Sequence, residues 1–379
     1  METIQPKLRF PEFKEIWEKK KLGEVSTNKS RKYNPLKDKE NRYIKCIELE
    51  HLSSDSGQLL GFIDGSNSGS IKNKFEKGDV LFGKLRPYLK KYLLSPFEGV
   101  CTSEIWVLKG TKISNPFLYC IVQTGNFIDI ANQSSGSKMP RADWNVVSNY
   151  EVNYPSLNEQ TKIANFLSSV DEKLNLLKEK KSLLEEYKKG IMQKIFNQEI
   201  RFKDDNGNDF EDWEEKTLGS LCKITTGKLD ANAMVEDGEY RFYTCAKDYY
   251  RIDKYAFDTE ALLISGNGAN VGYIHYYKGK FNAYQRTYIL DRFEENMTYV
   301  KFFLQMFLPK RIKGEKNDGN TPYIVLSTLS EMEFSIPCII EQTKIANFLS
   351  AIDEKIELVA NQIKDTQEYK KGLLQQMFV

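Results

Sequence analysis

Histidine is almost absent from this chain of 379 residues, which contains only His51 and His275. The cysteines lie far apart and form no Cys-x-x-Cys pair: Cys46, Cys101, Cys120, Cys222, Cys245 and Cys338. A zinc site needs clustered thiolate or imidazole ligands, and histidine is the side chain most often used in acid–base catalysis. We therefore expect no metal site, and reduced cysteines, the usual state of thiols in the cytosol.

Long apolar runs are missing as well. The longest stretches, such as residues 302–308, fall far short of the ~20 residues that a helix needs to span a bilayer. The first ten residues, METIQPKLRF, lack the apolar segment of a signal peptide. These absences predict a cytoplasmic protein without membrane contact, and its length predicts two or more domains.

A large excess of charge of either sign is the third absence. The chain has 55 Lys and Arg residues against 53 Asp and Glu, a formal net charge of +2. This balance excludes a free-standing polycation that coats nucleic acid. The charges are unevenly distributed, because residues 1–157 carry 24 basic and 18 acidic side chains (net +6) and residues 201–339 carry 18 and 22 (net −4).

An internal repeat determines the organisation of the chain. The sequence EQTKIANFLS occurs at 159–168 and again at 341–350, an offset of 182 residues, and 21 of the 38 residues in 159–196 are identical in 341–378. A second repeat relates Arg9-Phe10, Trp17-Glu18 and Leu22-Gly23 to Arg201-Phe202, Trp213-Glu214 and Leu218-Gly219. One copy of this connector directly follows the first copy of the longer repeat, whereas the copy that would follow the second stands at the start of the chain. We therefore expect a circular, pseudo-two-fold arrangement with neighbouring chain ends.

Each copy of the longer repeat is predicted to be a helix of ~38 residues, ~57 Å long at 1.5 Å per residue. Apolar residues recur in steps of three and four, which gives a narrow seam typical of a coiled coil. The predicted seam and partner contacts are Gln160, Ile163, Leu167, Val170, Leu174, Leu177 and Leu184, and Gln342, Ile345, Leu349, Ile352, Ile356, Val359 and Ile363. Lys181, Lys188, Thr366 and Lys370 interrupt the series. We expect the two seams to pair; the alternative is that each packs on its own globular region.

The chain thus divides into a connector with head 1 (1–157), a central helix (158–200), a connector with head 2 (201–339) and a C-terminal helix (340–379). Both heads are predicted to be mixed α/β (α+β) from β-rich runs and one helix each near their ends, at 116–130 and 299–312. The β-rich runs include 43–49, 79–82, 105–108 and 287–290. The heads share little sequence beyond their edges, so similar helices suit two copies of one partner and unlike heads suit two targets.

Two sets of residues are candidate DNA contacts. Cations neutralise phosphates, Arg can bind guanine bidentately, and Asn or Gln can bind adenine. In head 1 the candidates are Lys84, Arg86, Tyr88, Lys90, Lys91, Lys138 and Arg141. In head 2 they are Asn267, Asn270, Tyr284, Gln285, Arg286, Asn320 and Tyr323. A charge run of this kind is also common in solvated strands and turns, so no single residue is decisive.

Enzyme motifs are weak. The loop 266–272 (GNGANVG) resembles the glycine loop of S-adenosylmethionine or nucleotide folds but lacks the GxGxxG spacing and a GKS/T end. Residues 114–117 (SNPF) resemble a tetrapeptide of amino-methyltransferases, although they are better explained as the start of a helix with Pro116 in its first turn. We expect no catalytic residues in this chain.

The arrangement resembles the specificity (S) subunit of type I restriction–modification systems. The doubled signature Glu-Gln-x-x-Ile-Ala-x-x-Leu after a proline carries the resemblance, together with Asp171, Asp353 and the repeated connectors. The resemblance implies two target recognition domains, each of which reads half of an asymmetric bipartite site in double-stranded DNA. The helices would form an antiparallel spacer and help to dock two modification (M) subunits.

The resemblance also implies a non-catalytic chain without a cofactor of its own. S-adenosylmethionine would be held by the M subunits, and ATP and Mg are expected on partner subunits of the full complex, which includes restriction (R) subunits. Two other hypotheses remain: a coiled-coil scaffold whose heads bind protein or another ligand, and a methyltransferase-like enzyme that uses the 266–272 loop.

Overall fold

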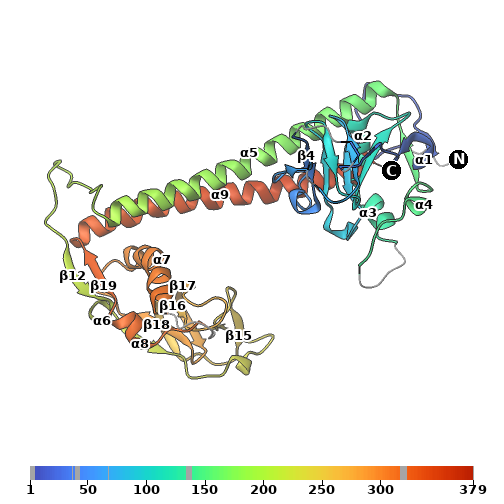
Figure 1. The fold of residues 1–379 in the computed structure, drawn as a ribbon. Coiled ribbons are helices and arrows are strands. Elements are labelled where there is room, and N and C mark those ends of the chain that lie inside the picture. The colour runs from blue at the N-terminus through green and yellow to red at the C-terminus, as the bar shows by residue number, and fades with distance from the viewer. Residues whose placement is uncertain are drawn as a thin grey trace. The chain divides into compact units, whose positions relative to one another are not determined.

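The computed structural model describes residues 5–35, 37–38, 43–66, 68–133, 139–315 and 322–378. The chain forms two compact units, 1–179 with 360–379 and 180–359. Each unit combines one head with parts of both long helices, so the fold is mixed α/β as expected (Figure 1). The boundaries predicted from the sequence lie at 157, 200 and 339, whereas the compact units divide each long helix near its middle.

The two repeats form long helices, α5 (Leu157–Phe196) and α9 (Ile339–Met377). Most seam residues are buried, including Val359 near the middle of α9, whereas Leu177, Leu184, Ile356 and Ile363 are half-buried. In the first unit, Leu167 of α5 shares a core with Leu373 of α9, and in the second, Ile195 of α5 shares one with Leu349 of α9. In each unit the start of one helix therefore packs against the end of the other, which confirms antiparallel pairing.

Two of the polar residues that interrupt the seam, Lys188 and Lys370, form ion pairs with the opposite helix. Lys370 lies 2.5 Å from Asp171, and Lys188 lies 2.6 Å from Asp353. The repeat offset of 182 converts one pair into the other. Burial raises the pKa of Asp171 although Lys370 opposes this, so desolvation outweighs the attraction. Such pairs contribute little net stability, and we interpret them as fixing the antiparallel register.

Head 1 is built from short strands and short helices. A four-stranded sheet has the order β2-β10-β7-β8, a five-stranded sheet the order β3-β6-β9-β4-β5, and β1 pairs with β11. The strands are β1 (Glu18–Lys21), β2 (Ser26–Thr27), β3 (Lys32–Tyr33), β4 (Lys45–Ile47), β5 (Ile63–Asp64), β6 (Lys72–Phe75), β7 (Val80–Gly83), β8 (Tyr92–Leu94), β9 (Gly99–Cys101), β10 (Ile105–Gly110) and β11 (Glu151–Tyr154). The helices are α1 (Leu22–Val25), α2 (Asn115–Ile121), α3 (Gly125–Ala131) and α4 (Trp144–Val147).

Head 2 is organised around one six-stranded sheet of order β13-β18-β16-β17-β14-β15, and β12 pairs with β19. The strands are β12 (Glu214–Thr217), β13 (Lys223–Thr226), β14 (Tyr240–Tyr243), β15 (Tyr250–Ile252), β16 (Phe257–Ser265), β17 (Ile274–Ala283), β18 (Thr287–Asp291) and β19 (Glu333–Ile336). The helices are α6 (Leu218–Leu221), α7 (Met297–Gly314) and α8 (Leu326–Ser330). The heads therefore differ in topology although both attach to the same kind of helix pair.

One of the two predicted head helices was wrong in extent. The helix expected over 116–130 is divided into α2 and α3, because the Thr124 side chain accepts a hydrogen bond from the Phe127 amide and starts a new helix. The helix expected over 299–312 is present as α7. The strands expected around 43–49, 79–82, 105–108 and 287–290 correspond to β4, β7, β10 and β18.

The two ends of the chain meet in the first unit, as the repeat predicts. The Leu8 amide donates to the Gln376 carbonyl at 2.9 Å, and the Phe378 ring lies 5.4 Å from that of Phe117. The N and C labels of Figure 1 mark this neighbourhood. Within the described part of the chain, no helix is long and apolar enough to cross a membrane.

Candidate nucleic-acid interface

The candidate residues of head 1 lie on a tight loop after β7. The Arg86 amide donates to the Pro140 carbonyl and the Ala142 amide to the Lys84 carbonyl, both at 2.8 Å, so the fold brings the 139–142 segment beside this loop. Arg86 and Lys90 adopt left-handed backbone conformations with φ of 52° and 49°. Such conformations are uncommon for residues other than glycine and mark a constrained turn.

The candidate side chains of head 1 differ in exposure and in whether they already have a partner within the head. Arg86 and Tyr88 are exposed, and Lys84 is half-buried. Three other candidates have partners inside head 1: Lys90 lies 3.5 Å from Asp55, Lys91 donates to the Leu49 carbonyl at 2.6 Å, and Arg141 lies 3.0 Å from Glu104. Lys138 lies outside the described residues. Arg86 and Tyr88 are therefore the candidates best placed to contact a ligand.

The candidate residues of head 2 come together from three loops. Asn267 forms a β-bridge with Tyr323, and the Gly266 amide donates to the Arg286 carbonyl at 2.8 Å. The Tyr284 amide donates to the Tyr243 carbonyl, also at 2.8 Å. The loops 266–273, 284–286 and 322–324 thus form one surface at the ends of the sheet strands.

Two of these polar side chains are engaged within head 2. The Asn270 amide nitrogen donates to the Cys245 carbonyl at 3.0 Å, and that of Gln285 donates to the Asp230 carboxylate at 2.9 Å. Arg286 and Tyr323 are exposed. Asn320 lies outside the described residues. The exposed arginine and tyrosine therefore parallel Arg86 and Tyr88 of head 1.

The two weak enzyme motifs have structural explanations. The 266–272 loop connects β16 to β17, two antiparallel strands, so no helix follows the strand as a nucleotide-binding loop requires. Gly268 and Gly272 have φ of +79° and +81°, which only glycine adopts readily. Ser114 caps α2 by accepting from the Phe117 amide, as expected for a helix start.

A buried carboxylate joins the N-terminal connector to α5. Glu159 is only 1% exposed, and both of its oxygens accept hydrogen bonds from Arg9 at 2.7 Å. The Trp17 indole nitrogen lies 3.4 Å from the same carboxylate. Hydrogen bonding to Glu159 raises the pKa of Arg9. We call these three residues the first junction clamp.

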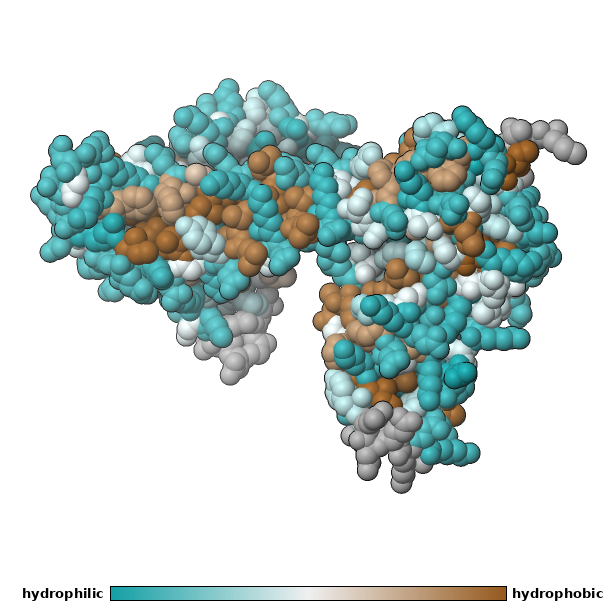
Figure 2. Space-filling view, turned by 90° about the horizontal axis from the view of Figure 1, so that it is seen from above, coloured by the Kyte–Doolittle hydropathy of each residue, from teal (hydrophilic) through white to brown (hydrophobic). Residues whose placement is uncertain are grey.

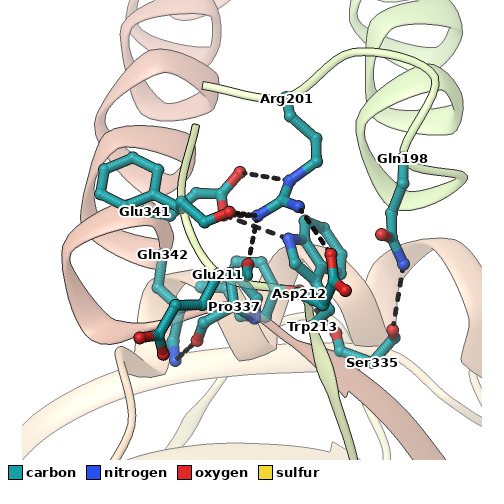
Figure 3. Close-up of polar contacts among 11 residues, drawn as sticks. Gln198, Arg201, Glu211, Asp212, Trp213, Ser335, Pro337, Glu341 and Gln342 are labelled. Carbon is teal, nitrogen blue, oxygen red and sulfur yellow. Dashed lines mark hydrogen bonds and ion pairs between the residues drawn. The ribbon is translucent and has the colours of Figure 1, made fainter. Parts of the chain in front are cut away.

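The second unit repeats this clamp (Figure 3). Arg201 donates to the two oxygens of Glu341 at 3.3 and 2.8 Å, and the Trp213 indole donates to it at 3.1 Å. Glu341 is fully buried, and Arg201 also donates to the Glu211 carbonyl at 2.6 Å. Arg201, Trp213 and Glu341 form the second junction clamp, which ties the connector of head 2 to the start of α9.

The glutamine after each clamp carboxylate holds its own head. Gln160 accepts a hydrogen bond from the Ser114 amide at 2.8 Å, and Gln342 accepts one from the Asn296 amide at 2.9 Å. Ser114 and Asn296 are the N-caps of α2 and α7 and are related by the repeat offset. Both glutamines, expected in the seam, therefore contact their heads instead. The Glu-Gln signature fixes how each head attaches to the helix pair.

Sequence reasoning assigned no role to the clamp residues. Both connectors repeat an arginine and a tryptophan, and both signatures begin with glutamate, so the repeat alone contained the necessary signal. A strictly repeated cation, indole and carboxylate in otherwise different regions indicates a shared contact.

Known proteins provide an independent comparison. A family model described as "Type I restriction modification DNA specificity domain" matches residues 14–186 and again 210–368. The specificity subunit of the type I restriction enzyme EcoDI from Escherichia coli is 36% identical over 164 residues, which are 43% of this chain and 36% of that subunit. The MjaVIII specificity subunit of Methanocaldococcus jannaschii is 22% identical over 368 residues, covering 88% and 80% of the two chains.

Solved structures share the fold. The crystal structure of a type I restriction–modification S subunit from M. genitalium covers 99% of both chains with a TM-score of 0.63 at 17% identity. A chain from a structure of an assembled type I R-M system covers 95% of this chain and 96% of its own length, with a TM-score of 0.59 at 20% identity. Since the family model covers most of the chain in two copies, the chain belongs to the type I restriction–modification DNA specificity family.

Proposed function

We propose that this chain is the non-catalytic DNA-reading subunit of a type I restriction–modification complex, and that each head reads one half of an asymmetric bipartite site. The observation that carries the proposal is the combination of two unlike heads with two equivalent junctions. Each head is attached by the same Arg–Glu–Trp clamp and the same glutamine, yet the sheets differ in topology. Two heads that are attached in the same way but have different surfaces suit a single DNA duplex with two different half-sites.

Base-edge contacts from the head loops would supply sequence choice, and phosphate contacts would fix the position on the duplex. In head 1 the exposed Arg86 is the best candidate for bidentate contact with guanine. In head 2 the exposed Arg286 has the corresponding role. The helices would set the number of base pairs between the half-sites.

The helices would also dock two modification subunits. Figure 2 shows apolar surface that interrupts the hydrophilic surface on one face of the molecule. On the helices, Leu176 and Leu358 are each 59% exposed, and Tyr187 and Tyr369 are 54% and 55% exposed. The repeat offset relates the members of each pair. Two equivalent apolar positions support two copies of one partner, which would carry S-adenosylmethionine, while R subunits would use ATP and Mg.

The proposed division of labour predicts a one-sided effect of Arg86→Ala. The variant should lose discrimination at one base pair of the first half-site, worth about 1–3 kcal/mol, without a change at the second half-site. Methylation of a library of duplexes with single substitutions, by the chain co-expressed with its modification subunit, measures both half-sites at once. Arg286→Ala is the matched control for the other half-site. Equal losses at both half-sites after Arg86→Ala would contradict separate reading.

The net charge of −4 in head 2 favours a second candidate, a scaffold whose heads bind protein. Salt distinguishes the two functions. Binding of DNA by the complex should weaken steeply as salt rises, because counterions are released from the phosphates. Association with a protein partner that persists at high salt, without any binding of DNA at low salt, would favour the scaffold.

A further inference from the structure

Head 1 contains a basic groove outside the 84–91 loop and the 139–142 segment. The groove has a volume of about 760 Å³ and lies where β4 and β9 begin and β6 ends. Five cations line it, from four separate stretches of the chain: Lys29, Arg31, Lys45, Lys74 and Lys109. Its acidic lining residues are Glu76 and Glu98, so positive charge is in excess.

The cations of the groove fall into two kinds. Lys109 is paired with Asp79 at 3.1 Å, whereas Lys45 and Lys74 lie over the rings of Phe97 and Tyr33, at 4.4 and 5.5 Å from the ring centroids. Lys29, Arg31 and Lys74 are exposed. Among the described residues none of these three has a carboxylate within ion-pair distance. The groove therefore presents three exposed cations to solvent.

The groove and the 84–91 loop lie at opposite ends of the β7–β10 pair. Ile105 pairs with Gly83 next to the loop, and Leu108 pairs with Val80 next to Lys109. The three residue steps from Ile105 to Leu108 correspond to about 10 Å of antiparallel strand. This separation corresponds to about three base pairs along a duplex at about 3.4 Å per base pair.

We propose that this groove binds the phosphate backbone of DNA beside the half-site that the 84–91 loop reads. The inference rests on the proposed function and adds a second contact surface to head 1. Ammonium and guanidinium groups neutralise phosphates without reading sequence, and such contacts fix the position of a protein on the duplex. The excess of cations over carboxylates matches a polyanion. The cations come from separate stretches of the chain but line one concave surface, so they can contact neighbouring phosphates of the same DNA strand.

The test combines Lys29→Ala, Arg31→Ala and Lys74→Ala in the chain co-purified with its modification subunit. The probe is a duplex that contains the motif methylated by the wild-type complex, and the readout is the slope of log affinity against log salt. Each lost phosphate contact lowers the magnitude of the slope by about 0.9, so the triple variant should lose about 2.7. The methylated motif should stay the same, because the groove reads no bases.

Two further variants control this result. Lys7→Ala, Lys14→Ala and Lys173→Ala together remove three exposed cations of the same unit outside the groove, and should leave the slope unchanged. Lys29→Arg with Lys74→Arg keeps both charges and should preserve the slope, while thermal melting of every variant checks folding.

A wild-type slope in the folded triple variant would overturn the proposal, and so would an equal loss in the control triple. Loss of the modification subunit with the DNA slope intact would show that the groove binds an acidic protein surface instead. If the wild-type complex neither binds nor methylates any duplex, the proposed function itself fails, which separates the two ideas.

Discussion

Replacing Arg201 by alanine is expected to destabilise the second unit by about 3–5 kcal/mol, because the fully buried Glu341 loses its cation. Among the described side chains, the Trp213 indole would be the remaining donor to the carboxylate. Amide hydrogen exchange of the complete chain measures this locally: protection should fall in peptides of the connector, head 2 and the start of α9, and should persist in head 1.

The chain offers a matched control and a rescue. Lys203 also pairs with a carboxylate, but both partners are largely exposed, so Lys203→Ala should cost less than about 1 kcal/mol. Adding Glu341→Gln to Arg201→Ala removes the buried charge and should restore part of the stability. Destabilisation of Arg201→Ala no larger than that of Lys203→Ala would mean that the clamp does not hold the junction.

A paired deletion in the helices is expected to change the DNA spacer. Removing 178–184 from α5 and 357–363 from α9 deletes seven residues between the two interhelical ion pairs on each helix, and keeps both pairs. Seven residues are two helical turns, or about 10.5 Å. The spacer of the methylated motif should shorten by about three base pairs at about 3.4 Å each, with both half-sites unchanged.

Deleting 178–184 alone is the control for this experiment. This deletion shortens the distance from Asp171 to Lys188 on α5 but leaves the distance from Asp353 to Lys370 on α9 unchanged, so the two ion pairs cannot form together. We therefore expect methylation to be lost, and not moved to a motif with a different spacer. Genome-wide mapping of methylated adenines reads out both deletions. An unchanged spacer after the paired deletion would refute the role of the helices as a ruler.

The helical part of the fold was predictable because the repeat and the 3.5-residue period are local patterns. Ile163 and Leu167 share a buried core with the end of α9 and with head 1, and their equivalents share one with the end of α5 and with head 2. The sequence alone did not explain the polar residues in the seam, because Asp171 and Lys370 are distant in sequence and become partners only through antiparallel pairing. The junction clamps also join distant residues, although the repeated arginine, tryptophan and glutamate marked them in the sequence.

The heads were less predictable than the helices. Their strands are short, and several pair with distant segments, such as β7 with β10 and β13 with β18. The charge run in the sequence indicated the loop around Arg86, but Lys91 donates a hydrogen bond to the Leu49 carbonyl within the head. The basic groove has no linear signal, because Lys29 and Lys109 are brought together only by the sheet.

The central claim, that two unlike heads read one bipartite DNA site, has a direct test. The complete chain is co-expressed with its modification subunit in a host that lacks this system, and methylated adenines are mapped across the genome. We expect one new motif that consists of two different half-sites separated by a fixed number of unspecified base pairs. A single contiguous motif, or no new methylation in the presence of both subunits, would contradict the account.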